Sequence, residues 1–230
     1  MHEPTATSIL LRLQVSGAIP PDAVVVAHKG RAEWVERGML LRLAVHKGSH
    51  SELVWTLFVG DPVLGRPFHD GGILALLPLR REGGEGPWTW PTDEAQAAAS
   101  VEALVEVLAE ARAFVPTRRE LCHLLLAEGD VRHGRLVADL HSARAERLVR
   151  AIAIAQASHD DEVLAAALDI LDRSAAETPS DAPTSLRNQA LFWADQWTWQ
   201  SGRTISIPEA VPQRAAPVHQ DLGDFWERLG

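Results

Sequence analysis

Two arginine–histidine pairs carry the residue types that a phosphate-cleaving site would need. Arg118 precedes His123, and Arg135 precedes His141, within the stretch "VPTRRELCHLLLAEGDVRHGRLVADLH". A histidine can act as acid and base on a ribose 2′-hydroxyl while an arginine holds the phosphate. On a helix, however, Arg118 and His123 lie about 140° apart. The simpler interpretation is that Arg118 and Arg119 are solvated and that His123 flanks a leucine-rich core face.

The spacing of these pairs resembles that of a family of helical ribonucleases in which an Arg-x4–6-His motif lies at a helix start. The resemblance implies metal-independent RNA cleavage by Arg118 and His123, in a site that a second protomer completes. Members of that family usually carry a polar residue directly after the arginine; this chain has Arg119 and Leu136 there. Ribonuclease activity is therefore kept as an alternative function.

Other histidines lie close together in the sequence without the pattern of a metal site. His46 and His50 flank a predicted hairpin turn, and His28, His69 and Asp70 lie in neighbouring loops. A zinc site needs three or four ligands that converge on the ion. We interpret these residues as polar turn residues and expect no metal.

Nucleophilic and phosphate-binding motifs are missing from the sequence. It contains no Gly-x-Ser-x-Gly, and the glycines of "GGEG" are not followed by Lys-Ser or Lys-Thr. Cys122 is predicted in the middle of a helix beside leucines, where a free thiol is usually inert. We therefore expect no cofactor and no enzyme.

Composition places the chain among folded proteins with an acidic surface. Hydrophobic residues make up 46% and charged residues 23% of the chain, and the net charge is −9. A nucleic-acid binder would normally show a basic stripe, so we do not expect that class of partner. Cys122 is the only cysteine, which excludes an intrachain disulfide. The N-terminal residues lack the pattern of a signal peptide and no long apolar run is present, so we predict a bacterial-type cytoplasmic location without membrane contact.

The two halves of the sequence have different hydrophobic periods. The first half has short apolar runs typical of strands: Ser8–Val15, Ala23–Ala27, a hairpin of Met39–Lys47 with Leu53–Gly60, and Ile73–Leu79. Helical periodicity follows from residue 92. We predict an α+β fold with an N-terminal antiparallel β-sheet followed by a C-terminal helical array. The predicted regions are 1–90 mainly β, 91–203 helical, and 204–230 an irregular tail with a short docking helix; one integrated domain is the alternative.

Five helices are predicted in the second half. The second begins with the capping box Thr117/Glu120, and the third spans about Arg135 to Ala157. Acidic residues after Ser158 open the fourth, and "SHDD" (158–161) is interpreted as helix capping rather than a metal cluster. The third and fourth helices, "LVRAIAIAQASHDDEVLAAALDIL", resemble a tetratricopeptide-like helical hairpin in their small residues and short turn. The resemblance covers about thirty residues and implies a packing style.

Tryptophan is the unusual feature, with eight in the chain. On the fifth helix, "SLRNQALFWADQWTWQ", Trp193 and Trp197 share one face with Leu186 and Ala190, while Phe192 and Trp199 extend the apolar arc to about half the circumference. Trp88 and Trp90 lie in the proline-bracketed connector "PWTWP". These aromatic residues either pack inside the protein or form binding anchors, since tryptophan is enriched in binding hot spots. Our candidate binding residues are Trp88, Trp90, Trp193 and Trp197.

These observations favour a non-enzymatic protein–protein interaction module. Acidic and aromatic surface would be presented to another protein, which we expect to be basic. An immunity or accessory protein of a bacterial conflict or defence system would fit this description. A structural subunit of a larger assembly is a second alternative, beside the ribonuclease.

Overall fold

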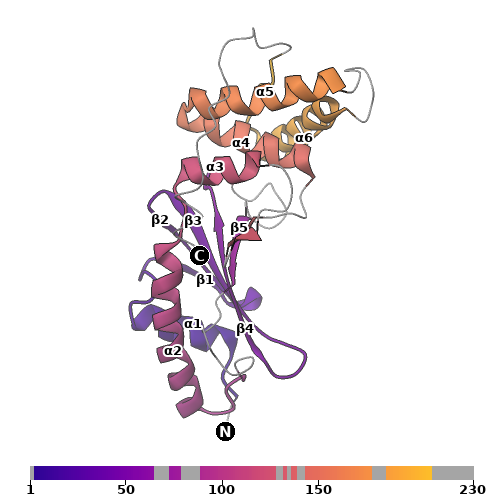
Figure 1. Ribbon diagram of the computed structural model, residues 1–230. Coiled ribbons are helices and arrows are strands. Elements are labelled where there is room, and N and C mark those ends of the chain that lie inside the picture. The colour runs from indigo at the N-terminus through magenta and orange to yellow at the C-terminus, as the bar shows by residue number, and fades with distance from the viewer. Residues whose placement is uncertain are drawn as a thin grey trace. The chain divides into compact units, whose positions relative to one another are not determined.

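The computed structural model describes residues 3–64, 73–78, 89–127, 132–133, 136–138, 143–177 and 185–208 (Figure 1). Two compact units are present, each built from two stretches of sequence. The first unit combines Met1–Val59 with Ala75–Val115, and the second combines Gly60–Leu74 with Pro116–Gly230. An antiparallel sheet is followed in the chain by a set of helices, so the predicted α+β class is confirmed. The predicted region boundaries stay predictions, and most of the predicted tail lies outside the described residues.

The sheet of the first unit has its strands in sequence order. These are β1 (Val24–Val26), β2 (Arg31–Glu36), β3 (Met39–Lys47), β4 (Leu53–Gly60) and β5 (Ile73–Pro78). β1 and β2 pair antiparallel with Val24 opposite Glu33, and β2 and β3 pair antiparallel with Trp34 opposite Leu41. The predicted hairpin arms match β3 and β4, and two other predicted strands match β1 and β5. β2 was not predicted.

One face of this sheet forms the core of the first unit. Side chains on it alternate with those of the other face, as the pleat requires. Its buried residues are Ala32, Trp34, Leu41, Leu43, Val45, Leu53, Trp55, Leu57 and Val59. Helices α1 (Ala6–Val15) and α2 (Glu94–Ala113) pack on this unit, α1 against α2 and against β1 to β3 (Figure 1).

The prediction of a strand at Ser8–Val15 was wrong, because these residues belong to the helix α1. A capping box starts it: the Thr5 hydroxyl accepts a hydrogen bond from the Ser8 backbone N–H, and the Ser8 hydroxyl accepts one from the Thr5 N–H. Ile9, Leu10 and Leu13 are then fully buried on one side. This short apolar run could be buried equally well by a helix or by a strand. The capping box at Thr5 favours the helix.

Arg112 in the last turn of α2 joins this helix to β2 and to the segment after α1. Its guanidinium forms an ion pair with Glu36 of β2 (Nη2–Oε2 2.8 Å) and donates from Nη1 to the carbonyl of Ala18, which follows α1 (3.1 Å). Burial by itself would raise the pKa of Glu36. Hydrogen bonds from Arg112 and from the Trp34 indole, with the positive charges of Arg112 and Arg37, outweigh burial and lower that pKa.

A close backbone approach fixes the start of β2. Gly30 ends the short 3-10 turn Ala27–Lys29 and has a φ of 56°, in the left-handed region. Its carbonyl accepts a hydrogen bond from the Val45 N–H at 2.7 Å. A Cβ atom at this position would lie 2.5 Å from the Val45 carbonyl oxygen. Only glycine fits here without displacing the neighbouring strand β3.

Among its described residues, the second unit has four helices and a small hairpin. The helices are α3 (Arg118–Leu126), α4 (Arg144–Ser158), α5 (Asp161–Glu177) and α6 (Leu186–Ser201), and α4 packs against the other three. β6 (Arg132–His133) and β7 (Leu136–Ala138) pair antiparallel. The prediction that the third helix begins near Arg135 was therefore wrong, because the chain forms β7 before α4 begins at Arg144.

The predicted helical hairpin corresponds to α4 and α5. A turn of His159 and Asp160 joins them, and His159 caps α4 in the left-handed conformation (φ 55°). The Asp160 carboxylate accepts a hydrogen bond from the Val163 N–H at the start of α5 (3.2 Å). Ala151, Ala153 and Ala155 of α4 are small and buried, and α4 packs against α3, α5 and α6. This arrangement confirms the interpretation of "SHDD" as a helix cap.

Candidate functional site

Arg118, the arginine of the possible ribonuclease pair, is held in an ion pair. The capping box Thr117/Glu120 is formed as predicted and places Arg118 at the first position of α3. Its Nε atom donates to Asp61 Oδ2 at 2.5 Å. Asp61 has no exposed surface, and its Oδ1 atom also accepts a hydrogen bond from the Val63 N–H (2.8 Å). Arg118 is thus the charge that compensates a buried carboxylate.

His123 does not join Arg118 in a common site. It lies on α3 and is half-buried, and its Nε2 atom is shielded from solvent with no hydrogen-bond partner among the described residues. The pocket that Arg118 lines does not include His123. The second pair, Arg135 and His141, lies outside the described residues.

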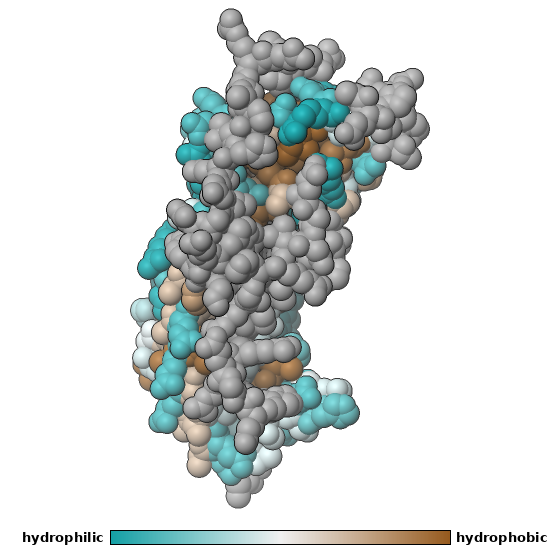
Figure 2. Space-filling model, viewed as in Figure 1, coloured by the Kyte–Doolittle hydropathy of each residue, from teal (hydrophilic) through white to brown (hydrophobic). Residues whose placement is uncertain are grey.

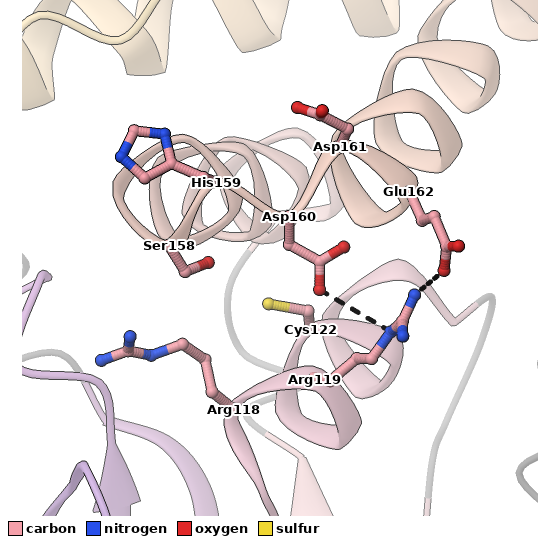
Figure 3. Close-up of a pocket in the computed structure, with 8 residues that line it drawn as sticks. All are labelled: Arg118, Arg119, Cys122, Ser158, His159, Asp160, Asp161 and Glu162. Carbon is pink, nitrogen blue, oxygen red and sulfur yellow. Dashed lines mark ion pairs between the residues drawn. The ribbon is translucent and has the colours of Figure 1, made fainter.

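A pocket of about 420 Å³ opens between the start of α3 and the turn that joins α4 to α5 (Figure 3). Its lining residues are Arg118, Arg119, Cys122, Ser158, His159, Asp160, Asp161 and Glu162. Arg119, one of these lining residues, pairs with Asp160 (Nε–Oδ2 3.6 Å) and with Glu162. The same Asp160 caps α5. These charged groups therefore hold α3 against the α4–α5 turn.

The thiol of Cys122 at this pocket is not a nucleophile at neutral pH. Its side chain is buried, and burial, reinforced by the negative charges of Asp61 and Asp160, raises its pKa to about 12 against the opposing charge of Arg118. The reactive species of a cysteine is the thiolate, and almost none is present at such a pKa. Cys122 acts as a small core residue, as its sequence context predicted.

The histidines considered as metal ligands are dispersed. His28, His46 and His50 are exposed side chains of the first unit, while His69 and Asp70 lie outside the described residues. Among the residues that the structure describes, no three His, Cys, Asp or Glu side chains are grouped as metal ligands would be. In the same ranges, no helix is long and apolar enough to cross a membrane.

The predicted anchor tryptophans are placed in different surroundings. Trp90 is buried in the first unit and donates its backbone N–H to the Ser51 carbonyl (2.7 Å). On α6, Trp197 is 2% exposed and Trp193 is half-buried. Trp88 lies outside the described residues. The proposed role of all four in binding stays a prediction, but the side chains of Trp90 and Trp197 contribute to the core.

The opposite side of α6 carries the exposed aromatic surface. Trp199 is 83% exposed, Phe192 57% and Leu191 40%. Phe192 and Trp199 are seven positions apart and so lie within about 20° of each other around the helix. Phe192 also packs its ring edge-on against Trp193, with the ring centroids 5.7 Å apart. We call Leu191, Phe192 and Trp199 the α6 aromatic face.

The sequence contained a signal for this face. The buried residues Ala190, Ala194 and Trp197 form a narrow stripe that spans about 60° around the helix. The apolar arc of α6 is wider than that stripe, and the excess is Phe192 and Trp199. Figure 2 shows hydrophobic side chains reaching the surface of the helical unit with hydrophilic ones beside them.

Comparisons of the chain with known protein families, with curated proteins and with solved structures give no match. The geometry of the two surfaces described above, the charged pocket and the α6 aromatic face, is therefore the basis for a functional proposal.

Proposed function

We propose that this chain is a protein-binding module that uses the α6 aromatic face as its contact surface. The observation that carries the proposal is Trp199, which is 83% exposed on the side of α6 opposite to the buried Trp197. Large exposed aromatic side chains are costly in water and are enriched where partners bind. A partner that covered Trp199 and Phe192 would remove their apolar surface from water.

Charge supports a basic partner. Asp195 is exposed and lies on the same side of α6, three residues after Phe192 and four before Trp199. The whole chain carries a net charge of −9. A basic residue beside an apolar patch on the partner would match this arrangement and would be attracted at long range.

An immunity or accessory protein of a bacterial conflict system, acting in the cytoplasm, is one form of this proposal. Such a role needs binding alone, and it does not require the pocket beside Arg118 to perform chemistry. A structural subunit of a larger assembly would use the same face for a permanent contact.

The proposal is tested by capture from a native-host lysate on the immobilised 230-residue chain. We expect one protein to be retained by the wild type and to be lost at least tenfold in Trp199→Ser, because a hot-spot tryptophan contributes about 2 kcal/mol or more. Val15→Ser removes a side chain that is 90% exposed on α1, away from α6; it is the matched control and should retain the protein. Equal capture by both variants would show that another surface binds.

The ribonuclease alternative makes a different prediction. It requires that purified chain cleaves RNA without metal and that His123→Ala abolishes the cleavage. We expect the RNA to remain intact with both proteins. Cleavage that depends on His123 would replace the binding proposal.

A further inference from the structure

A single carboxylate lies at the centre of the α6 aromatic face. Along α6, Asp195 follows Leu191 by four residues and Phe192 by three, and it precedes Trp199 by four. Residues at these spacings are neighbours on the surface of a helix, so the three apolar side chains surround Asp195. All four residues are exposed. A partner that covers the apolar side chains therefore also covers this carboxylate.

The carboxylate of Asp195 has no cation within the chain. Among the described residues, no basic side chain forms an ion pair with it, whereas Asp172 of α5 pairs with Arg187 (2.6 Å). A carboxylate that is taken out of water without a cation is strongly destabilising. The occupant of the α6 aromatic face must therefore bring a positive charge to Asp195.

The exposed ring of Trp199 attracts the same kind of ligand. An indole presents a negative π face, which attracts a cation more strongly than the rings of tyrosine and phenylalanine do. Trp199 is 83% exposed and lies about 40° from Asp195 around the helix. One cation can therefore be placed against the carboxylate and the ring together.

Arginine is the side chain that best fits this pair of groups. Its planar guanidinium can stack on an indole and can donate two parallel hydrogen bonds to a carboxylate, whereas the ammonium of lysine is a compact point charge. The aliphatic stem of an arginine also packs on apolar surface. Leu191 and Phe192 supply such a surface beside Asp195.

The size and the charge of the face favour a short segment of another protein. Aromatic side chains present about 150–250 Å² each, so Trp199 and Phe192 expose on the order of 300 Å². A standard interface takes about 800 Å² from each partner. A second copy of the chain in a two-fold contact would place Asp195 against its own counterpart. An anionic membrane would be repelled by the net charge of −9.

From these observations we propose that the α6 aromatic face recognises an arginine of the partner, flanked by apolar residues in a short segment. The inference rests on the proposed function, because it names the group that the partner places on that surface. The guanidinium stacks on Trp199 and pairs with Asp195, while the apolar neighbours of the arginine cover Phe192 and Leu191.

The test is a thermodynamic cycle on the purified 230-residue chain with defined peptides. The probe is a fluorescein-labelled helical peptide of leucine, alanine, glutamine and a single arginine that lies between two leucines on one side. The reference peptide has citrulline, an uncharged isostere, in place of the arginine. Fluorescence anisotropy gives the Kd of each peptide. We expect the wild type to bind the arginine peptide at least tenfold more tightly, a difference of about 1.4 kcal/mol.

Three variants assign this preference to individual side chains. Asp195→Asn keeps the size of the side chain and removes its charge, so the ratio of the two Kd values should fall below about three. Glu106→Gln is the matched control, because it removes one exposed charge on α2 in the first unit; it should keep the tenfold ratio. Trp199→Leu keeps an apolar side chain without a ring and should weaken the arginine peptide about threefold.

Equal affinity of the wild type for the two peptides would overturn the inference, and so would the absence of binding by either peptide. A ratio that falls equally in Asp195→Asn and Glu106→Gln would assign the preference to the overall acidic charge of the chain and would also overturn it. An unchanged Kd in Trp199→Leu would refute the stacking of the guanidinium on the ring.

Failure of this inference can be told apart from failure of the proposed function. Asp195→Lys keeps the three apolar residues of the α6 aromatic face and reverses the charge at its centre, so capture from lysate should fall at least tenfold. A protein that is retained equally by wild type and Asp195→Lys but lost by Trp199→Ser would overturn the inference and leave the proposed function. Arginine-dependent peptide binding without any captured protein would support the arginine site and contradict the proposed function.

Discussion

Two tryptophans on α6, two positions apart, should respond in opposite ways to the same substitution. Trp197 is 2% exposed and Trp199 is 83% exposed. They lie about 160° apart around the helix. Replacing each by alanine therefore tests directly which side of α6 is packed and which is presented to solvent.

The expected magnitudes follow from these exposures. Removal of a fully buried tryptophan costs about 3–5 kcal/mol of unfolding free energy, because it loses apolar contacts and leaves a cavity. Trp199 buries only the remainder of its surface, about 40 Å² of about 250 Å², which is worth about 1 kcal/mol. The gain in helix propensity from alanine is the same for both. The two variants should differ by about 2–4 kcal/mol.

Urea unfolding followed by far-ultraviolet circular dichroism measures this difference. With a slope of about 1–3 kcal/mol per molar urea, the midpoint of the helical unit should fall by at least about 1 M in Trp197→Ala and change little in Trp199→Ala. Equal losses in the two variants, or a larger loss in Trp199→Ala, would refute the orientation of α6 and with it the α6 aromatic face.

Three further substitutions test contacts elsewhere in the two units. Arg118→Ala should lower the free energy of unfolding in urea by about 2 kcal/mol or more, because it leaves the buried Asp61 carboxylate without its cation. A variant as stable as the wild type would show that Arg118 is not needed for the fold and would be consistent with a catalytic role. Glu36, whose pKa is lowered in the folded chain, favours folding above the pKa of the unfolded chain, and this contribution is lost as the pH falls through the folded pKa. The advantage of wild type over Glu36→Gln in thermal unfolding should therefore shrink from neutral pH to below pH 4.5, and a constant difference would contradict the assigned contacts. Gly30→Ala should lower the free energy of unfolding by about 1–3 kcal/mol, because alanine is strained in the left-handed conformation and its Cβ would be too close to the Val45 carbonyl oxygen. An unchanged melting temperature would show that β3 can move to make room for the Cβ atom.

The part of the fold that was predictable from sequence is the part determined by local patterns. Alternating apolar and polar residues on either side of a polar turn correctly predicted β3 and β4. The Thr117/Glu120 capping box correctly predicted the start of α3. The prediction of a strand at Ser8–Val15 was wrong because an apolar run of eight residues is too short to distinguish the helical period of 3.6 residues from the strand period of 2. The start of α4 was misplaced because the helical period was extended back across "GRLVADLHSA", which includes a strand.

The contacts that decide the candidate sites could not be predicted in the same way. Arg118 and Asp61 are 57 residues apart, and no local pattern connects a loop carboxylate to a distant helix start. The apolar arc of α6 covers about half of the circumference, and the sequence does not show which part of that arc is buried. Only packing of Ala190 and Trp197 against the neighbouring helices leaves Phe192 and Trp199 outside.

The pairing of Asp61 with Arg118 also bears on how the chain is made. Asp61 leaves the ribosome 57 residues ahead of Arg118, a delay on the order of 3–10 s at typical rates of synthesis. During that interval the Asp61 carboxylate has no Arg118 to pair with. A protein cut at Val115 would not yield two independent halves, because the fragment from Pro116 onward would contain the guanidinium of this pair without its carboxylate.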